Sequence, residues 1–121
     1  MLAKSIMTEH VESMVRRYRR GLVNSMLEYL ILDNIERRDV CGYDIITTLC
    51  LEFQVLLSPG QVYPVIDALE RGGVITKERN GRRVALRLTS LGYVLLKAWR
   101  DELGLMQLRL STERPPPEGV R

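Results

Sequence analysis

The fold is decided by residues 57–75, which read LSPGQVYPVIDALERGGVI. Ser58 and Pro59 are residue types preferred at the N-cap and at the first position of a helix. Gln61 lies three residues after Ser58, as in a capping box. The apolar residues that follow recur at helical spacing and are Val62, Ile66 and Leu69. Two glycines then end the pattern, so the stretch predicts a short capped helix with polar residues in its first turns.

A basic β-hairpin is predicted directly after this helix, over Val74 to Leu88. Asn80-Gly81 is typical of a two-residue type I′ turn, and apolar residues occupy every second position of 84–88. That turn predicts a register in which Ile75 faces Leu86, Lys77 faces Val84, Glu78 faces Arg83 and Arg79 faces Arg82. A capped helix followed by a basic hairpin is what a winged helix-turn-helix presents to DNA.

Helical patterns flank this unit. A first helix is expected over residues 5–20 and ends at Gly21, and a second runs from Leu22 to Glu36. A third covers Gly42 to Phe53 and buries Tyr43, Ile46, Leu49 and Phe53. Thr89 is placed to cap a last helix over Ser90 to Leu110. The expected fold class is mostly α with a small β-hairpin wing: a winged helix-turn-helix with additional helices at both ends.

This pattern divides the chain into four parts. Residues 1–20 are expected to form an N-terminal dimerisation helix, and residues 21–88 the winged helix-turn-helix DNA-binding domain. Residues 89–110 are expected to form a C-terminal dimerisation helix. Residues 111–121 contain three consecutive prolines and are expected to be a disordered tail.

Charge is segregated along the chain, although the net charge of the 121 residues is only +3. Arg16, Arg17, Arg19 and Arg20 lie within five residues, and the hairpin carries Lys77, Arg79, Arg82, Arg83 and Arg87 against Glu78. Residues 22–70 are acidic. Two basic patches on an acidic body favour a polyanionic partner, while the plainer interpretation is that these arginines only solvate a helix and a hairpin.

The sequence lacks the motifs of an enzyme. His10 is the only histidine, and no phosphate-binding loop, dinucleotide motif or nucleophile with its base is found. Two cysteines cannot form a structural zinc site by themselves, so no metal and no cofactor are expected. The absence of a signal-like or membrane-spanning apolar run favours a cytoplasmic protein.

Two apolar stripes are wider than this small domain can cover, which favours a homodimer. The predicted interface comprises Met7, Val11, Met14, Tyr18, Leu91, Leu95, Ala98, Trp99, Leu105 and Met106. Trp99 is the only tryptophan and would occur twice at a two-fold interface. Two facing indoles could hold a planar aromatic compound, although Trp99 also suits a plain interface core without a ligand.

The same residues resemble PadR-type winged-helix transcriptional regulators. The resemblance rests on Leu57–Gly60, Val62–Pro64 and Gly73–Ile75, with Leu27–Leu32, Gly42–Ile46, Gly81–Arg83 and Leu88–Gly92 around them. It spans about residues 20–100, and the chain departs from the family at Gln61, where threonine is common, and at Cys41, where histidine is common. The resemblance implies a dimer joined through terminal helices, repression of promoters and, in some members, release from DNA by a flat hydrophobic compound.

The predicted interface with double-stranded DNA lies on the helix after Ser58 and on the hairpin. It comprises Ser58, Pro59, Gly60, Gln61, Tyr63, Pro64, Lys77, Arg79, Asn80, Arg82 and Arg83. Pro64 stands inside a helix, where a chain keeps proline when something outside needs the bend or the ring. Tyr63-Pro64 could also only pack on a neighbouring helix. The competing function is a winged-helix protein-interaction module without DNA binding, which has no need for five cations in eleven positions.

Overall fold

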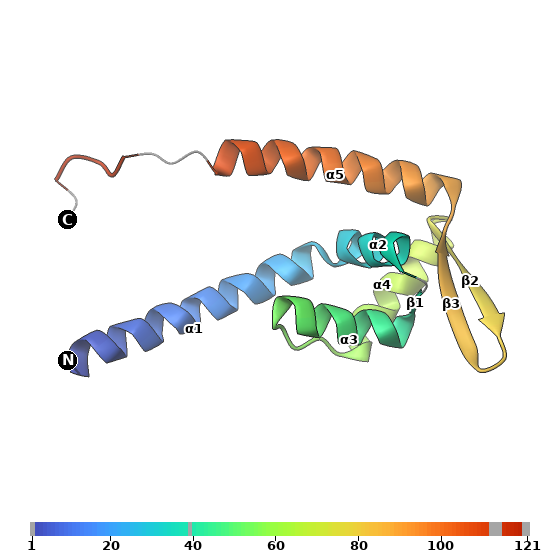
Figure 1. Cartoon of the computed structure of the whole chain (residues 1–121), viewed down its shortest axis with the longest axis horizontal. Coiled ribbons are helices and arrows are strands. Elements are labelled where there is room, and N and C mark those ends of the chain that lie inside the picture. The colour runs from blue at the N-terminus through green and yellow to red at the C-terminus, as the bar shows by residue number, and fades with distance from the viewer. Residues whose placement is uncertain (1, 39, 112–114, 120–121) are drawn as a thin grey trace.

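The computed structural model describes residues 2–38, 40–111 and 115–119. Its elements in chain order are α1 (Leu2–Ser25), α2 (Leu27–Arg37), β1 (Val40–Cys41), α3 (Gly42–Phe53), α4 (Pro59–Arg71), β2 (Ile75–Asn80), β3 (Arg83–Leu88) and α5 (Ser90–Leu110). Figure 1 shows α2, α3 and α4 gathered beside the sheet, while α1 and α5 both extend away from this body toward the same side. The expected class, mostly α with a small β wing, is confirmed.

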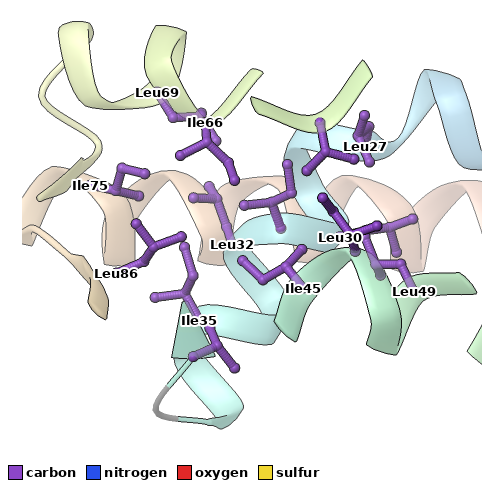
Figure 2. Packing of buried hydrophobic residues seen from close by; sticks show 14 of the residues in the cluster. Leu27, Leu30, Leu32, Ile35, Ile45, Leu49, Ile66, Leu69, Ile75 and Leu86 are labelled. Atoms are coloured by element: carbon purple, nitrogen blue, oxygen red, sulfur yellow. The ribbon is translucent and has the colours of Figure 1, made fainter. Parts of the chain in front are cut away.

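The core lies where α2, α3 and α4 meet the sheet. Ile31 and Leu32 of α2, Ile45 of α3 and Ile66 of α4 are all at most 1% exposed. Figure 2 shows the α4 and sheet side chains gathered around Leu32. Complete burial of such a side chain contributes roughly 1.5–3 kcal/mol. This cluster therefore fixes how α4 is oriented on the body.

The prediction that the first helix ends at Gly21 is wrong. α1 continues to Ser25, and the break falls at Met26, whose backbone N–H still donates to Leu22 O at 3.0 Å. A helical glycine costs about 1 kcal/mol relative to alanine, which a long helix tolerates. The chain changes direction at Met26 because α2 enters the core from Leu27 onward, whereas Val23 is the only buried residue of α1.

The sheet contains a strand that the sequence did not predict. Val40 and Cys41 form β1 and pair with Leu86 and Ala85 of β3, so the strand order is β1-β3-β2. Two residues are too short to produce an alternating pattern, which is why the strand escaped detection. Its consequence is that the start of α3 is attached directly to the hairpin.

The hairpin forms, but its predicted register is wrong by two residues. Ile75 pairs with Leu88, Lys77 with Leu86, Glu78 with Ala85, Arg79 with Val84 and Asn80 with Arg83. The loop is therefore Gly81-Arg82, with φ +66° at Gly81 and no positive φ at Arg82. A glycine at the first loop position is typical of a type II′ turn, which prevailed over the expected type I′ turn. A shift of two preserves the faces of the strands but removes the predicted opposition of Arg79 and Arg82.

The last helix begins as predicted, at a tight junction with the hairpin. Thr89 Oγ1 accepts from the backbone N–H of Gly92 at 3.1 Å and lies 2.6 Å from Gly73 O. Farther along α5, Arg100 donates to Asp33 and Glu36 of α2 at 3.0 Å each. α5 is thus attached to the body at its beginning and near its middle.

The termini add little to this body. Of the predicted tail, residues 112–114 and 120–121 lie outside the described residues, while 115–119 form no helix or strand, so its disorder stays a prediction. In the described part of the chain, no helix combines the length and apolar character needed to cross a membrane.

The junction at α5 gives a test of this packing. A Cβ at Gly92 would overlap Val74 O, whereas one at Gly104 would meet nothing within 4 Å. We expect Gly92→Ala to lower the free energy of unfolding by about 1–3 kcal/mol through overpacking. The matched control Gly104→Ala should raise it by roughly 0.5–1 kcal/mol because alanine is the better helix former. Chemical denaturation measures both, and a Gly92→Ala variant as stable as the parent would contradict the described junction.

Candidate nucleic-acid interface

The first turns of α4 form a polar surface on the outside of the body. Val62 is fully buried and holds this end of the helix in place. The remaining residues of the turn are exposed and are Ser58, Pro59, Gly60, Gln61, Tyr63 and Pro64. The helix runs without interruption through Pro64, whose ring lies four residues beyond Gly60. The structure therefore brings together the α4 residues that the sequence selected.

Gln61 has a structural task in this turn. Its Oε1 accepts hydrogen bonds from the Ser58 backbone N–H at 3.0 Å and from the Ser58 hydroxyl at 3.2 Å, and the predicted capping box is present. The Nε2 amide of Gln61 has no hydrogen-bond partner among the described residues. Gln61 can therefore offer donors to a ligand without leaving its cap, whereas a bidentate contact would require it to release Ser58.

Tyr63 packs on α3 and remains accessible. A Cβ added to Gly42 would lie 2.7 Å from Tyr63 Cε1, so the ring lies close against the first residue of α3. The side chain is nevertheless 40% exposed. The plain packing role and a ligand-binding role are therefore compatible for this residue.

The wing cations differ in their partners. Lys77 donates to Asp67 Oδ1 of α4 at 2.6 Å and lies 3.5 Å from Glu70 Oε1. Arg83 donates to Asp44 Oδ2 of α3 at 3.3 Å. Within the described ranges, Arg79 and Arg82 form no ion pair and are exposed. Lys77 and Arg83 thus attach the wing to the body, whereas Arg79 and Arg82 remain available at the tip of the hairpin.

The pKa values follow these contacts. The hydrogen bond from Lys77 lowers the pKa of Asp67, and the same contact raises the pKa of Lys77. The thiol and the backbone N–H of Cys41 lower the pKa of Asp44, with a smaller contribution from Arg83. Both carboxylates therefore stay ionised at neutral pH and keep the wing attached.

A cleft of about 680 Å³ separates the wing from α3 and α4. Its lining includes Tyr43, Tyr63, Lys77, Arg79, Arg82 and Arg83. Tyr43 was predicted to be buried, and this is wrong: it is 69% exposed. Its spacing to Ile46 suggested the core, but its place in the first turn of α3 turns it outward. The sequence did contain a signal for the exposure of Tyr43, which is its position two residues after Cys41, the N-cap of α3.

The two terminal helices expose apolar residues. On α1, Met7, Val11, Met14 and Tyr18 are all more than half exposed. The broad stripe predicted on α5 divides into two faces. Leu95 and Trp99 pack against the chain's own core, while Leu91, Ala98, Leu105 and Met106 remain exposed.

A smaller cleft of about 280 Å³ beside Trp99 is lined by Glu28, Tyr29, Glu102 and Met106 among others. The described residues contain no group of three side chains that could hold a metal ion.

Comparison with known proteins agrees with this geometry. No family model matches the chain. The transcriptional regulator YqjI of Escherichia coli is 29% identical over 98 residues, which cover 78% of this chain and 47% of that protein; a Shigella flexneri protein, also named YqjI, matches to the same extent. The chain thus spans about half the length of the curated relatives it matches.

Solved structures carry the likeness further. A PadR-like regulator from Bacillus cereus has a TM-score of 0.70 at 21% identity, covering 75% of this chain and 93% of its own. A PadR-family regulator from Eggerthella lenta has a TM-score of 0.59 at 26% identity, and the match covers 82% of this chain and 83% of that one. Bacillus subtilis PadR, solved in complex with operator DNA, has a TM-score of 0.54 at 25% identity, and the match covers 79% of this chain and 51% of that one. The predicted resemblance is confirmed: the chain has the winged-helix fold of PadR-type proteins, and the structural neighbours named here are transcription regulators rather than enzymes.

The capping role of Gln61 can be tested by measuring the stability of the protein. We expect Gln61→Ala to lower the free energy of unfolding by about 1 kcal/mol because the cap of α4 is lost. Gln61→Glu should retain the stability of the parent because a glutamate oxygen can accept the same two hydrogen bonds. Thermal denaturation of the two variants decides this, and equal stability of Gln61→Ala and the parent would show that the cap does not matter.

Proposed function

We propose that this PadR-type winged-helix chain is a sequence-specific DNA-binding transcriptional regulator that acts as a repressor and binds its operator as a homodimer. The observation that carries the proposal is the exposed, capped first turn of α4 beside a wing tip with two arginines free of ion pairs among the described residues. The likeness to a PadR solved with operator DNA supports it.

In this proposal, residues Ser58 to Pro64 enter the major groove. The free amide of Gln61 donates to a base edge, and Tyr63 reaches a phosphate or a thymine methyl group. Arg79 and Arg82, with Asn80 beside them, contact phosphates through the wing. Lys77 and Arg83 were predicted as DNA contacts as well, but their ion pairs with Asp67 and Asp44 favour a role in positioning the wing.

The competing function is a protein-interaction module. A protein partner would cover the apolar faces of α1 and α5 equally well, so those faces do not discriminate. The wing tip does discriminate. A protein partner would have to desolvate or pair the two arginines that form no ion pair with the described residues, whereas a DNA backbone offers phosphates along its whole length.

The exposed faces of α1 and α5 support the dimer. Leu105 and Leu91 are each 52% exposed on α5. A second copy would bury these residues together with the Met7 to Tyr18 face of α1, as a two-fold interface does with two copies of one patch. Because the relatives are bacterial proteins, whose DNA lies in the cytoplasm, we place the action of this chain there.

The small-molecule proposal is confined to the cleft beside Trp99. Glu28 and Glu102 line it together with two aromatic rings, which favours a planar aromatic cation. Such a compound would release DNA only if it bound the DNA-free form more tightly. Quenching of Trp99 fluorescence by a planar cationic dye tests the site, and a lack of quenching would remove it while leaving DNA binding intact.

The main test of DNA binding compares Arg79 and Arg82, which form no ion pair within the described ranges, with Lys77, which is paired with Asp67. Binding to the DNA upstream of the protein's own coding sequence is measured at several salt concentrations. We expect Arg79→Ala or Arg82→Ala to weaken binding to all sequences and to lower the salt slope by about 1 per lost contact, or about 2 per dimer. The control Lys77→Ala removes the same charge and should leave the slope unchanged. An equal fall of the slope for Lys77→Ala would contradict this division, and no binding by the parent would contradict the function itself.

The dimer is tested by sedimentation. We expect the parent chain to be a dimer at micromolar concentration and Leu105→Glu to be a monomer, because the new charge would be buried without a partner at the interface. Gln107→Glu adds the same charge on the other side of α5, since residues two apart do not share a helix face, and should stay dimeric. A monomeric parent, or a dimeric Leu105→Glu variant, would count against this interface.

A further inference from the structure

We infer that Tyr43 of α3 donates its hydroxyl to a DNA backbone phosphate seated in the cleft between α3 and the wing, so that the strand is held from both sides. This inference rests on the proposed function. It assigns a DNA contact to the helix before α4, at a residue whose spacing predicted a place in the core.

The exposure of Tyr43 is the first observation. Its side chain is 69% exposed in the first turn of α3, and its hydroxyl has no hydrogen-bond partner among the described residues. The backbone beneath it is firmly held. Cys41 and Asp44 form a capping box around it, and the Tyr43 carbonyl accepts from the Thr47 hydroxyl at 3.3 Å. A phenol on such a fixed base needs little reorganisation to bind a ligand.

The opposite wall of the cleft is the second observation. Tyr43 lines the cleft together with Arg79 and Arg82, the wing cations that form no ion pair within the described ranges. Asp44 is the carboxylate next in sequence to Tyr43. It accepts from the Cys41 thiol at 3.1 Å and from Arg83 at 3.3 Å, so this carboxylate already has a cationic partner. The cleft therefore offers two cations and a hydroxyl donor to an anion.

The order of the elements is the third observation. α3 precedes α4 directly, and in helix-turn-helix proteins the first helix crosses the DNA backbone while the second lies in the major groove. Phosphate oxygens commonly accept from tyrosine hydroxyls, and such contacts position the protein without reading sequence. With α4 in the groove, Tyr43 is placed at the strand that borders the groove, across from the wing.

A neutral donor has a signature that a cation lacks. It contributes a hydrogen bond to a charged group, but it does not replace a condensed counterion. We therefore expect Tyr43→Phe to weaken binding about 10-fold, equally for the upstream DNA and a random-sequence duplex. The slope of affinity against salt should stay that of the parent. Tyr93→Phe, which removes the hydroxyl of an exposed tyrosine on α5, is the matched control and should bind like the parent.

The phosphate itself can be identified with duplexes that carry a single uncharged methylphosphonate. One position in each half-site should weaken the parent more than it weakens Tyr43→Phe, because the hydroxyl contact is lost only from the parent whereas the wing arginines lose their partner in both proteins.

Each outcome separates the inference from the function. A parent that binds DNA and a Tyr43→Phe variant of equal affinity would overturn the inference and leave the function standing. Weak binding by Tyr43→Ala together with full affinity of Tyr43→Phe would mean that the ring matters rather than the hydroxyl, and would overturn it as well. A parent that binds no DNA would contradict the proposed function first.

Discussion

Val62 and Ile66 of α4 are at most 1% exposed, and their packing against α2 and α3 decides which way α4 can face. Once this side of the helix is buried, the polar residues of its first turns can only point outward. The chain that leaves α4 then continues into β2, and Leu86 of β3 enters the same core. The polar turn and the basic wing are therefore held on one rigid body, so their spacing is fixed before any ligand arrives.

The wing owes its position to charge as well as to packing. Lys77 and Arg83 each join it to a carboxylate of a different helix, Asp67 of α4 and Asp44 of α3. These are exposed pairs, each worth little for the stability of the fold. Their effect is on geometry, because they keep the hairpin close to the cleft, while Arg79 and Arg82 form no such pair with any described residue. A count of basic residues would treat the four as equivalent.

Local signals in the sequence predicted much of this structure. Ser58 and Thr89 begin helices as expected, and Gly42 to Phe53 forms α3 with the predicted bounds. The errors arose where distant contacts decide. Gly21 does not end α1, and the hairpin turn lies at Gly81-Arg82 instead of Asn80-Gly81. The strand β1 forms because Val40 pairs with Leu86, a residue distant in the sequence. Of the side chains that line the cleft, the sequence selected Tyr63 on α4 but assigned Tyr43 on α3 to the core, because its spacing to Ile46 is that of a buried helical face.

A hydroxyl-radical footprint of the protein on the DNA upstream of its own coding sequence tests the central claim most directly. The account predicts two equivalent protected segments related by a two-fold axis, with centres separated by one helical turn or a multiple of it, about 10 bp per turn. Each segment should include the backbone strand that lies between the wing and α3, at the border of the major groove that α4 enters. Uniform protection without symmetry, or no protection at all, would contradict it.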